Sequence, residues 1–172
     1  MDTIRITSGK LKGLTIATPG GKTHPMGARE RLALFNMIGE YLPGASVLDA
    51  FSGSGALGIE ALSRGASHAT LVENNTKAIQ VIKANLKKAG VNEDATVIKG
   101  DVYEAEGQFD LVMADPPYDE YDDTKILVLE KLVQPAGILV LSHPDTAPQM
   151  PGMELLKTHQ YAAAHISLYT KG

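Results

Sequence analysis

The sequence contains no cysteine and only five histidines, so two common kinds of functional site have few residues to draw on. Without cysteine there is neither a disulfide framework nor a thiolate nucleophile. The histidines stand at positions 24, 68, 143, 159 and 165. None of these spacings is typical of side chains that share one metal ion, and we therefore expect no metal site.

Long hydrophobic stretches are also absent. The N-terminal residues MDTIRITSGK hold no apolar core of the kind found in a signal peptide, and no run approaches about eighteen apolar residues, the length that spans a membrane. The 172 residues are 44% hydrophobic and 21% charged, which suits one globular domain with its own core. We expect a cytoplasmic protein that acts as a monomer and has no membrane partner.

Charge is unevenly distributed along the chain. The whole sequence carries a net charge of −4, whereas residues 1–37 hold six basic residues against two acidic ones. Clustered Lys and Arg side chains are the usual electrostatic mark of a nucleic-acid partner. A solvated basic face is the alternative, and the charge pattern alone leaves both open. The basic residues are Arg5, Lys10, Lys12, Lys22, Arg29 and Arg31.

Strand and helix patterns alternate along most of the chain. Two short strands around the turn SGKLKG predict an N-terminal β-hairpin, and a helix pattern follows them. The remainder predicts an α/β fold, a mostly parallel sheet with helices on both faces and a closing antiparallel strand pair. The expected strands are residues 3–7, 14–18, 46–51, 68–73, 95–100, 109–115, 137–142, 153–159 and 165–170, and the expected helices are residues 27–42, 55–65, 74–90 and 123–133.

The loop after the first parallel strand carries the glycines of a nucleoside site. In LDAFSGSGALG, Gly53, Gly55 and Gly58 have the spacing of a dinucleotide-binding turn, and Glu73 follows Gly53 by twenty residues, at the end of the next strand. Glycines let the backbone approach a ligand closely, and a carboxylate after the second strand suits a ribose diol. We therefore expect a ligand that contains a nucleoside.

Asp49 selects among nucleoside ligands. In a dinucleotide site the strand runs almost directly into the glycines, because the helix N-terminus receives a doubly negative pyrophosphate. Here Asp-Ala-Phe-Ser intervenes, and a carboxylate at the strand tip repels pyrophosphate but attracts a cation. S-adenosylmethionine, with an adenosine, a positive sulfonium and an amino group, fits Asp49, the glycines and Glu73 better. A structural aspartate that caps the turn is the alternative.

Another acid, Asp101, follows the third parallel strand. We expect its carboxylate to accept a hydrogen bond from the adenine amino group of the same cofactor. Ordinary turn formation by Gly100 and Asp101 is the alternative.

The stretch LVMADPPYDE places an acid, a stiff turn and an aromatic ring at a strand end. Pro116 and Pro117 donate no backbone hydrogen bond, so the sheet ladder stops at Asp115. Asp115 to Tyr118 resembles the Asp/Asn-Pro-Pro-aromatic motif of methyltransferases that modify exocyclic amines of nucleobases. Such an amine is a poor nucleophile because its lone pair is delocalised, and hydrogen-bond acceptors at Asp115 and the Pro116 carbonyl free that lone pair. Tyr118 is expected to stack on the target base.

Longer segments carry a narrower resemblance. RITSGKLKG, ALFNM, LDAFSGSGALGIEALSRGA, LVENN and ADPPY together resemble the RsmD family over nearly the whole chain. That family methylates the exocyclic amine, N2, of a guanine in small-subunit (16S) ribosomal RNA. The resemblance implies a Rossmann-like methyltransferase fold, S-adenosylmethionine as donor, S-adenosylhomocysteine as product and a partly assembled small ribosomal subunit as substrate.

Together, the residue patterns and this resemblance predict two regions of the chain and three sets of functional residues. Residues 1–42 form an RNA-facing extension and residues 43–172 the compact catalytic domain. The predicted catalytic residues are Asp115, Pro116, Pro117 and Tyr118. The predicted cofactor contacts are Asp49, Phe51, Gly53, Gly55, Glu73, Asn74, Asp101, Val102 and Asp115. The predicted RNA contacts are Arg5, Lys10, Lys12, Arg29, Arg31 and Tyr118.

The sequence departs from the family pattern in three places. His24-Pro25-Met26 stands where Arg-Pro-Thr is usual, and GARER keeps Arg29 and Arg31 but lacks the family's Asp. Leu14 replaces a common basic residue, and only seven residues separate Asp101 from Phe109, too few for the usual helix. Arg29 and Arg31 therefore have three open roles: phosphate contact, contact with the cofactor carboxylate, or helix surface.

Two other functions compete with guanine methylation of ribosomal RNA. One is methylation of an adenine or cytosine amine in DNA or another RNA, although the chain has no room for a separate domain that reads DNA sequence. The other is a non-catalytic binding module, in which Asp115 or the glycine loop is expected to have been lost. Both are intact.

Overall fold

The computed structural model describes residues 2–20, 26–161 and 164–172. Lys22 of the basic set, and His24 and Pro25 among the departures from the family pattern, lie outside these residues. Within the described part of the chain, no helix is long and apolar enough to cross a membrane.

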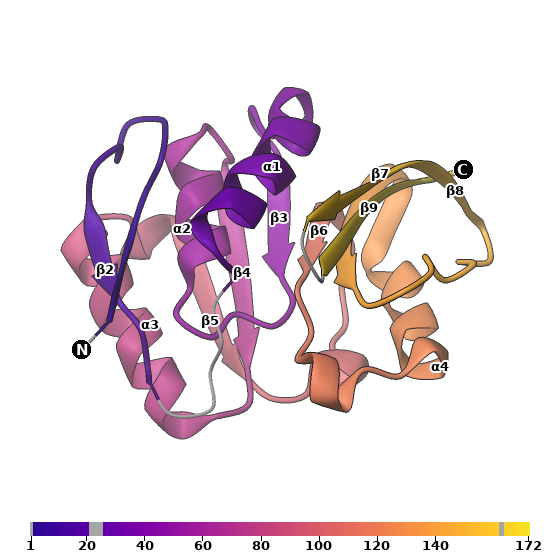
Figure 1. Cartoon of the computed structure of the whole chain (residues 1–172). Coiled ribbons are helices and arrows are strands. Elements are labelled where there is room, and N and C mark those ends of the chain that lie inside the picture. Colours follow the sequence, from indigo (N-terminus) through magenta and orange to yellow (C-terminus); the bar gives the residue numbers. More distant parts are fainter. Residues whose placement is uncertain (1, 21–25, 162–163) are drawn as a thin grey trace.

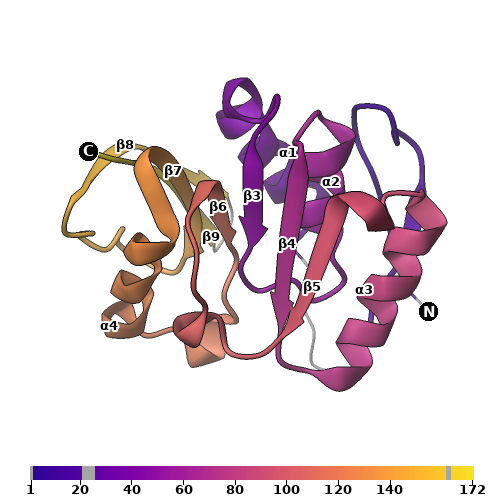
Figure 2. The same cartoon turned by 180° about the vertical axis from the view of Figure 1, so that it is seen from behind.

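A sheet of seven strands runs through the described residues in the order β5-β4-β3-β6-β7-β9-β8 (Figures 1 and 2). The first five strands in this order are parallel, and β9 pairs antiparallel with both β7 and β8. The predicted fold class, a mostly parallel Rossmann-like sheet with an antiparallel C-terminal pair, is confirmed. The strands are β3 (Ser46–Asp49), β4 (His68–Glu73), β5 (Ala95–Lys99), β6 (Phe109–Ala114), β7 (Val133–His143), β8 (Met153–Tyr161) and β9 (Ala164–Lys171).

The two faces of the sheet pack into separate hydrophobic clusters. Successive side chains of a strand point to opposite faces, so Val47 of β3 joins one cluster and Leu48 the other. The first cluster packs helices α1 (Ala28–Ile38), α2 (Ala56–Ser63) and α3 (Thr76–Ala89) against the sheet. The second packs α4 (Asp123–Ile126) and the 3₁₀ segment Leu127–Leu132. Helices therefore cover both faces, as expected.

Two of the expected helices are shorter than their patterns. The helix expected over 27–42 ends at Ile38, where Gly39 begins a 3₁₀ turn (Gly39–Tyr41) ahead of Pro43. The helix expected over 123–133 is α-helical only over α4 and then continues as a 3₁₀ segment. Its buried residues Ile126, Leu129 and Leu132 recur every third position, which matches the three-residue period of a 3₁₀ helix.

The N-terminal hairpin is bound to the helices of the larger unit. Strands β1 (Thr3–Arg5) and β2 (Thr15–Ala17) pair antiparallel, and the chain between them contacts Glu60 of α2. Glu60 has 0% of its surface exposed. Its carboxylate accepts hydrogen bonds from the backbone amides of Thr7 at 2.9 Å and Ser8 at 3.2 Å, and from the Nε of Arg64 at 3.0 Å. A buried carboxylate with so many donors fixes the hairpin on α2.

A second polar anchor joins the hairpin to α3. The side chain of Asn85 accepts a hydrogen bond from the Ala17 amide at 3.0 Å and donates one to the Ala17 carbonyl at 2.8 Å. This amide side chain pairs with both backbone groups of Ala17, as a residue of a neighbouring strand would.

Candidate active site

The site is built at the carboxyl ends of β3 and β6, which are neighbours in the sheet although they are far apart in the chain. Asp49 of β3 pairs with Met113 of β6, and the Ala50 amide donates to the Met113 carbonyl at 2.9 Å. From β3 the sheet continues to β4 and β5 on one side and, from β6, to β7 on the other. This is a topological switch point, where open α/β sheets bind their ligands.

The glycine loop between β3 and α2 is held open by positive φ angles. Gly53 has φ of 56° and Gly55, which precedes α2, has φ of 84°. A side chain at either residue would be strained in this conformation. Glu73, at the end of β4, binds the loop through its carboxylate, which accepts hydrogen bonds from the Gly53 amide and the Asn75 amide, both at 2.9 Å.

Gly58 has a packing role within this loop and helix. A Cβ atom at Gly58 would lie 2.8 Å from Cδ2 of Leu71 in β4, so a side chain here would have to displace this buried leucine. Its amide donates to Oδ2 of Asp49 at 3.0 Å. The three glycines thus position the loop and the helix behind it.

Asp49 is buried, with 1% of its surface exposed. Burial raises its pKa to about 7, against the hydrogen bonds from Gly58 and Ser52, which lower it; the nearby carboxylates of Asp115 and Glu73 raise it further. The bond to Gly58 supports the structural alternative, in which Asp49 caps the turn. Contact with the cofactor stays a prediction, which the acidic surroundings favour because they attract a cation.

The Asp-Pro-Pro-Tyr segment follows β6 directly. Asp115 is partly buried, and burial raises its pKa to about 6, although a hydrogen bond from the Ser142 side chain lowers it. Pro116 is buried and Pro117 exposed, so the turn is packed on one side only. Tyr118 is 38% exposed, and its hydroxyl oxygen lies 2.6 Å from Oγ of Ser142 in β7. An acid, a backbone carbonyl and an aromatic ring therefore lie close together just after the carboxyl end of β6.

The predicted adenine side of the site lies after β5. Asp101 is exposed and caps a 3₁₀ turn, Val102–Glu104, by accepting a hydrogen bond from the Tyr103 amide at 2.9 Å. Val102 beneath it is buried. Phe51, from the glycine loop, packs edge-on against Tyr103 with ring centroids 5.8 Å apart. Asp101 thus stabilises a turn, as the alternative reading of the sequence expected, and adenine binding by Asp101 and Val102 remains a prediction.

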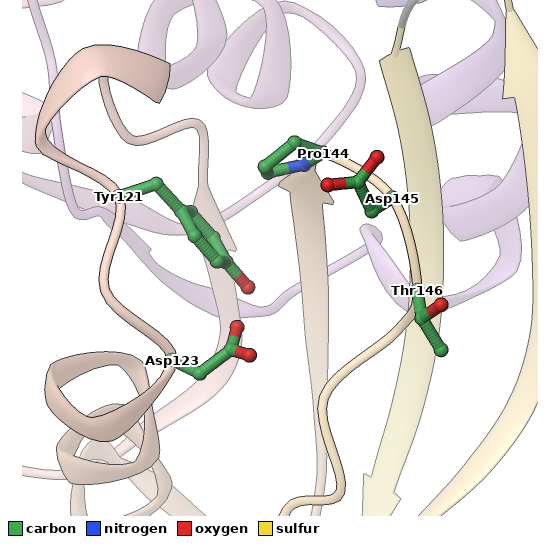
Figure 3. A pocket seen from close by; sticks show the side chains of 5 residues that line it. All are labelled: Tyr121, Asp123, Pro144, Asp145 and Thr146. Atoms are coloured by element: carbon green, nitrogen blue, oxygen red, sulfur yellow. The ribbon is translucent and has the colours of Figure 1, made fainter.

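A hollow of about 270 Å³ lies beyond the carboxyl end of β7 (Figure 3). In Figure 3 the Tyr121 hydroxyl points toward the Asp123 carboxylate, and Asp145 lies across the opening. Two carboxylates in one hollow repel phosphate, so we expect an RNA backbone to avoid this surface. The lining residues are Tyr121, Asp123, Pro144, Asp145 and Thr146.

The predicted RNA contacts separate into exposed and buried residues. Arg5, Lys10, Lys12 and Arg29 are exposed. Arg31 is only 4% exposed, and its guanidinium donates to the Arg5 carbonyl at 2.9 Å. This placement corrects the role expected for Arg31, because a side chain that is buried and already bound inside the fold presents no charge to phosphate. The helix pattern could have predicted this burial, because Arg31 lies on the same face of α1 as the buried Leu34, Phe35 and Ile38.

Lys10 and Lys12 lie far from the glycine loop. The amide of Lys10 donates to the carbonyl of Ser63, the last residue of α2, at 2.9 Å. The glycine loop precedes the first residue of the same helix, whose eight residues span about 12 Å. Figure 1 shows the β1–β2 loop at the end of the molecule opposite the arrowhead of β3. Any RNA that contacts both regions must extend along the protein.

Comparison with known proteins confirms the family. A family model described as Conserved hypothetical protein 95 matches residues 4–170. Ribosomal RNA small subunit methyltransferase D of Escherichia coli (strain K12) is 37% identical over 122 aligned positions, which cover 67% of this chain and 60% of that protein. The chain belongs to the RsmD family.

Two other similar proteins match over nearly the full length. Putative rRNA methyltransferase YlbH of Bacillus subtilis is 34% identical, and the match covers 98% of this chain and 99% of that protein. The solved structure titled Putative methyltransferase yhhF from Escherichia coli superposes with a TM-score of 0.88 at 28% identity, covering 99% of this chain and 98% of that one. As expected from its length, the connection from β5 to β6 in this member holds only a 3₁₀ turn. Among the described residues, no group of three or more His, Cys, Asp or Glu side chains is arranged to hold a metal ion.

Proposed function

We propose that this chain transfers a methyl group from S-adenosylmethionine to the exocyclic amine, N2, of a guanine in small-subunit (16S) ribosomal RNA. The observation that carries the proposal is the position of Asp115, an acid with a pKa of about 6 at the end of β6, next to the glycine loop of β3. The names of the relatives in Escherichia coli and Bacillus subtilis, both rRNA methyltransferases, support the substrate class.

The residues at the sheet edge fit S-adenosylmethionine. Strands β3 and β4 end in Asp49 and Glu73, β6 is followed by Asp115, and the loops after these strands contain no Lys or Arg. This edge of the sheet therefore favours a cation over a phosphate. We assign Glu73 to the ribose hydroxyls, Asp101 and Val102 to adenine, and the backbone of Gly53 and Gly55 to the amino-acid portion, with Phe51 and Asn74 beside them. When bound, the cofactor supplies a methyl group on a positively charged sulfur, and S-adenosylhomocysteine is released.

Asp115 and Pro116 act on the amine that receives the methyl group. The Asp115 carboxylate and the Pro116 carbonyl each accept one N–H of the exocyclic amine, which leaves the nitrogen lone pair free to attack. The nitrogen gains a bond to the methyl carbon and must lose one proton, which Asp115 holds or passes to water. Pro117 stiffens the turn, so the carbonyl is in place before the base arrives.

Tyr118 is assigned to the base itself. Its ring is partly exposed at the sheet edge, beside Asp115. Stacking of an aromatic ring on a base contributes roughly 1–3 kcal/mol and does not depend on base identity. A base that is stacked here while its amine bonds Asp115 has to leave its own helix or loop, which favours a partly assembled ribosomal subunit over a folded duplex.

The test is nucleoside analysis of methylated RNA. Small ribosomal subunits and their assembly intermediates, taken from cells that lack the protein, are incubated with the purified chain and isotopically labelled S-adenosylmethionine, and the RNA is digested for mass spectrometry. We expect the label in N2-methylguanosine, and incorporation at least about a hundredfold slower with Asp115→Ala. Label in a methylated adenine or cytosine would establish the alternative reaction, and absence of cofactor binding by calorimetry would favour a non-catalytic module.

A further inference from the structure

The outermost strand of the sheet carries two aromatic rings that the proposed reaction does not use. Strand β8 lies beyond β9, at the edge of the sheet (Figure 1). The rings of His159 and Tyr161 are nearly parallel, with an interplanar angle of 12° and centroids 6.0 Å apart. Tyr161 is partly buried against the cluster that includes α1, whereas His159 is exposed. One ring is therefore supported by the core, and its neighbour faces solvent.

This ring pair lies on the same face of the sheet as the anchor of Tyr118. The Tyr118 hydroxyl oxygen is 2.6 Å from Oγ of Ser142 in β7. Ser142 pairs with Ile166 of β9, and Ile166 in turn pairs with His159. Directly paired residues of antiparallel strands point to one face, so these three side chains share the face on which α1 packs. Two strand spacings, about 10 Å, separate Ser142 from His159.

The two directions in which RNA can leave Tyr118 differ in charge. The hollow that holds Asp123 and Asp145 lies toward the other face, since Tyr121 in its wall packs against the second cluster. Toward β8, residues 155–172 contribute no acidic side chain. An RNA strand is repelled by the carboxylates of the hollow and meets no such repulsion from these C-terminal residues.

We propose that His159 and Tyr161 form a second base-stacking site, which binds a base close to the target guanine in the same single strand. The proposal rests on the proposed function, in which Tyr118 stacks on the target base. A strand whose target base has been flipped out has lost stacking contacts, and the second site replaces one of them. Flat rings stack on any base, so this site adds affinity without sequence preference and needs no contact with phosphate.

The first measurement compares two RNA probes that share their phosphates and differ in their bases. One is a short uridine oligonucleotide, and the other is the same ribose-phosphate chain without bases. Wild type is expected to bind the uridine probe more tightly. His159→Ala is expected to weaken binding of the uridine probe at least about fivefold, the low end of what one stacked base contributes, and to leave binding of the abasic probe unchanged.

Two further variants separate stacking from other causes. Gln160→Ala is the matched control, because Gln160 is exposed on the same strand but points to the opposite face, and it should bind both probes as wild type does. His159→Tyr keeps a flat ring that carries no positive charge, so it is expected to restore binding of the uridine probe. Without this recovery, the effect of His159 is not stacking, and the proposal fails.

The supporting ring is tested separately. Tyr161→Leu keeps an apolar side chain against the core but removes the ring behind His159. We expect weaker binding of the uridine probe, by less than in His159→Ala, and unchanged binding of the abasic probe. Wild-type affinity in Tyr161→Leu would contradict a site made of both rings.

Three results of the probe comparison would overturn the proposal. Wild type binding both probes equally would show that bases contribute nothing. An equal loss for both probes in His159→Ala would assign His159 to the RNA backbone. An unchanged affinity of His159→Ala for the uridine probe would leave His159 as an exposed ring without a nucleic-acid ligand.

The second measurement relates the ring pair to methyl transfer on small-subunit assembly intermediates. Because His159 is assigned to a base that does not react, His159→Ala should raise KM for RNA with kcat nearly unchanged, whereas Tyr118→Ala should also lower kcat. Affinity for S-adenosylmethionine should be that of wild type. A fall in kcat as large as the fall in kcat/KM would contradict the assignment of His159 to a neighbouring base. If wild type methylates no RNA, the proposed function fails, while the probe comparison still decides whether these rings bind bases.

Discussion

Partial burial raises the pKa of Asp115 to about 6, so its charge changes within the pH range of ordinary assays. Only the ionised carboxylate accepts an amine N–H with both oxygens free, and it is protonated below its pKa. We therefore expect the single-turnover rate of methyl transfer to rise with pH around 6 and to level off above it. Asp49, with a pKa of about 7, is a second group that titrates nearby.

Substitutions of Asp115 assign this pH dependence. Asp115→Ala is expected to lower the rate at least about a hundredfold while leaving RNA binding nearly intact, the scale of one electrostatic or acid–base contact. Asp115→Asn keeps one acceptor oxygen and should retain more activity than the alanine variant, without the rise near pH 6. If that rise persists in Asp115→Asn, it belongs to Asp49. A wild-type rate in Asp115→Ala would make Asp115 a turn residue only.

Glu73 gives a prediction about cofactor affinity. Glu73→Ala is expected to weaken S-adenosylmethionine binding by about 1–3 kcal/mol, measured by calorimetry, because hydrogen bonds to a charged acceptor are lost. The carboxylate also holds the Gly53 amide at 2.9 Å, so part of the loss comes from the loop. Glu73→Gln keeps an acceptor for Gly53 and should bind more tightly than the alanine variant. Unchanged affinity in a folded Glu73→Ala protein would show that the assigned site is wrong.

At the residue scale, the sequence was informative about position where position follows from local spacing, while the roles assigned to these residues stay predictions. Asp115 and Glu73 were predicted because each stands at the end of an apolar strand. Ser142 and Glu60 were missed because their partners are distant in the chain, as when Glu60 accepts from Thr7, and one sequence does not state such pairings. Arg31 was misassigned because its charge was given more weight than its place on the buried face of α1.

At the scale of elements, one buried acid contributes strongly to holding the hairpin on the helices. Glu60 of α2 is fully buried and accepts hydrogen bonds from the hairpin and from Arg64. Glu60→Ala leaves the Arg31 and Arg64 guanidiniums without this partner, and breaking a buried ion pair typically costs about 3–5 kcal/mol. We expect a loss of this order in the free energy of unfolding by urea.

Two controls define what this loss means. Glu93→Ala removes an exposed acid of the same type and is expected to change stability by less than about 0.5 kcal/mol. Glu60→Gln keeps the shape and an acceptor oxygen and should lie between the two. If Glu60→Ala is no less stable than Glu93→Ala, the hairpin is held by its apolar contacts instead.

Helices and strands were predicted best where residues close in the sequence determine their type and their ends. The predicted ends of the parallel strands mostly agree with the structure within two residues, because a short apolar run between turn residues can hardly form anything but a buried strand. The exception is β7, which begins at Val133 instead of residue 137. The segment after Asp122 was expected as one helix, but its spacing of three favoured 3₁₀ geometry once Ile126, Leu129 and Leu132 were buried together. Such packing is a tertiary effect, which local patterns do not contain.

At the scale of the whole molecule, the acids and the exposed bases are separated. Acids line the carboxyl edge of the sheet at Asp49, Glu73 and Asp115, whereas Lys10 and Lys12 lie at the far end of α2. A cationic cofactor and an anionic RNA are thereby attracted to different regions of one surface. We therefore propose that the hairpin holds RNA that extends beyond the target nucleotide, which is the role predicted for residues 1–42.

Salt dependence tests this division. Each phosphate contact that is lost flattens the plot of log affinity against log salt by about 0.7–0.9 units. We therefore expect Lys10→Ala combined with Lys12→Ala to weaken RNA binding and to reduce the slope by up to that amount per residue, while S-adenosylmethionine affinity stays the same. The control combines Lys125→Ala with Lys157→Ala, which removes the same charge from two exposed lysines of α4 and β8. If both double variants give the same slope, net charge alone sets RNA affinity, and Lys10 and Lys12 belong to a solvated surface.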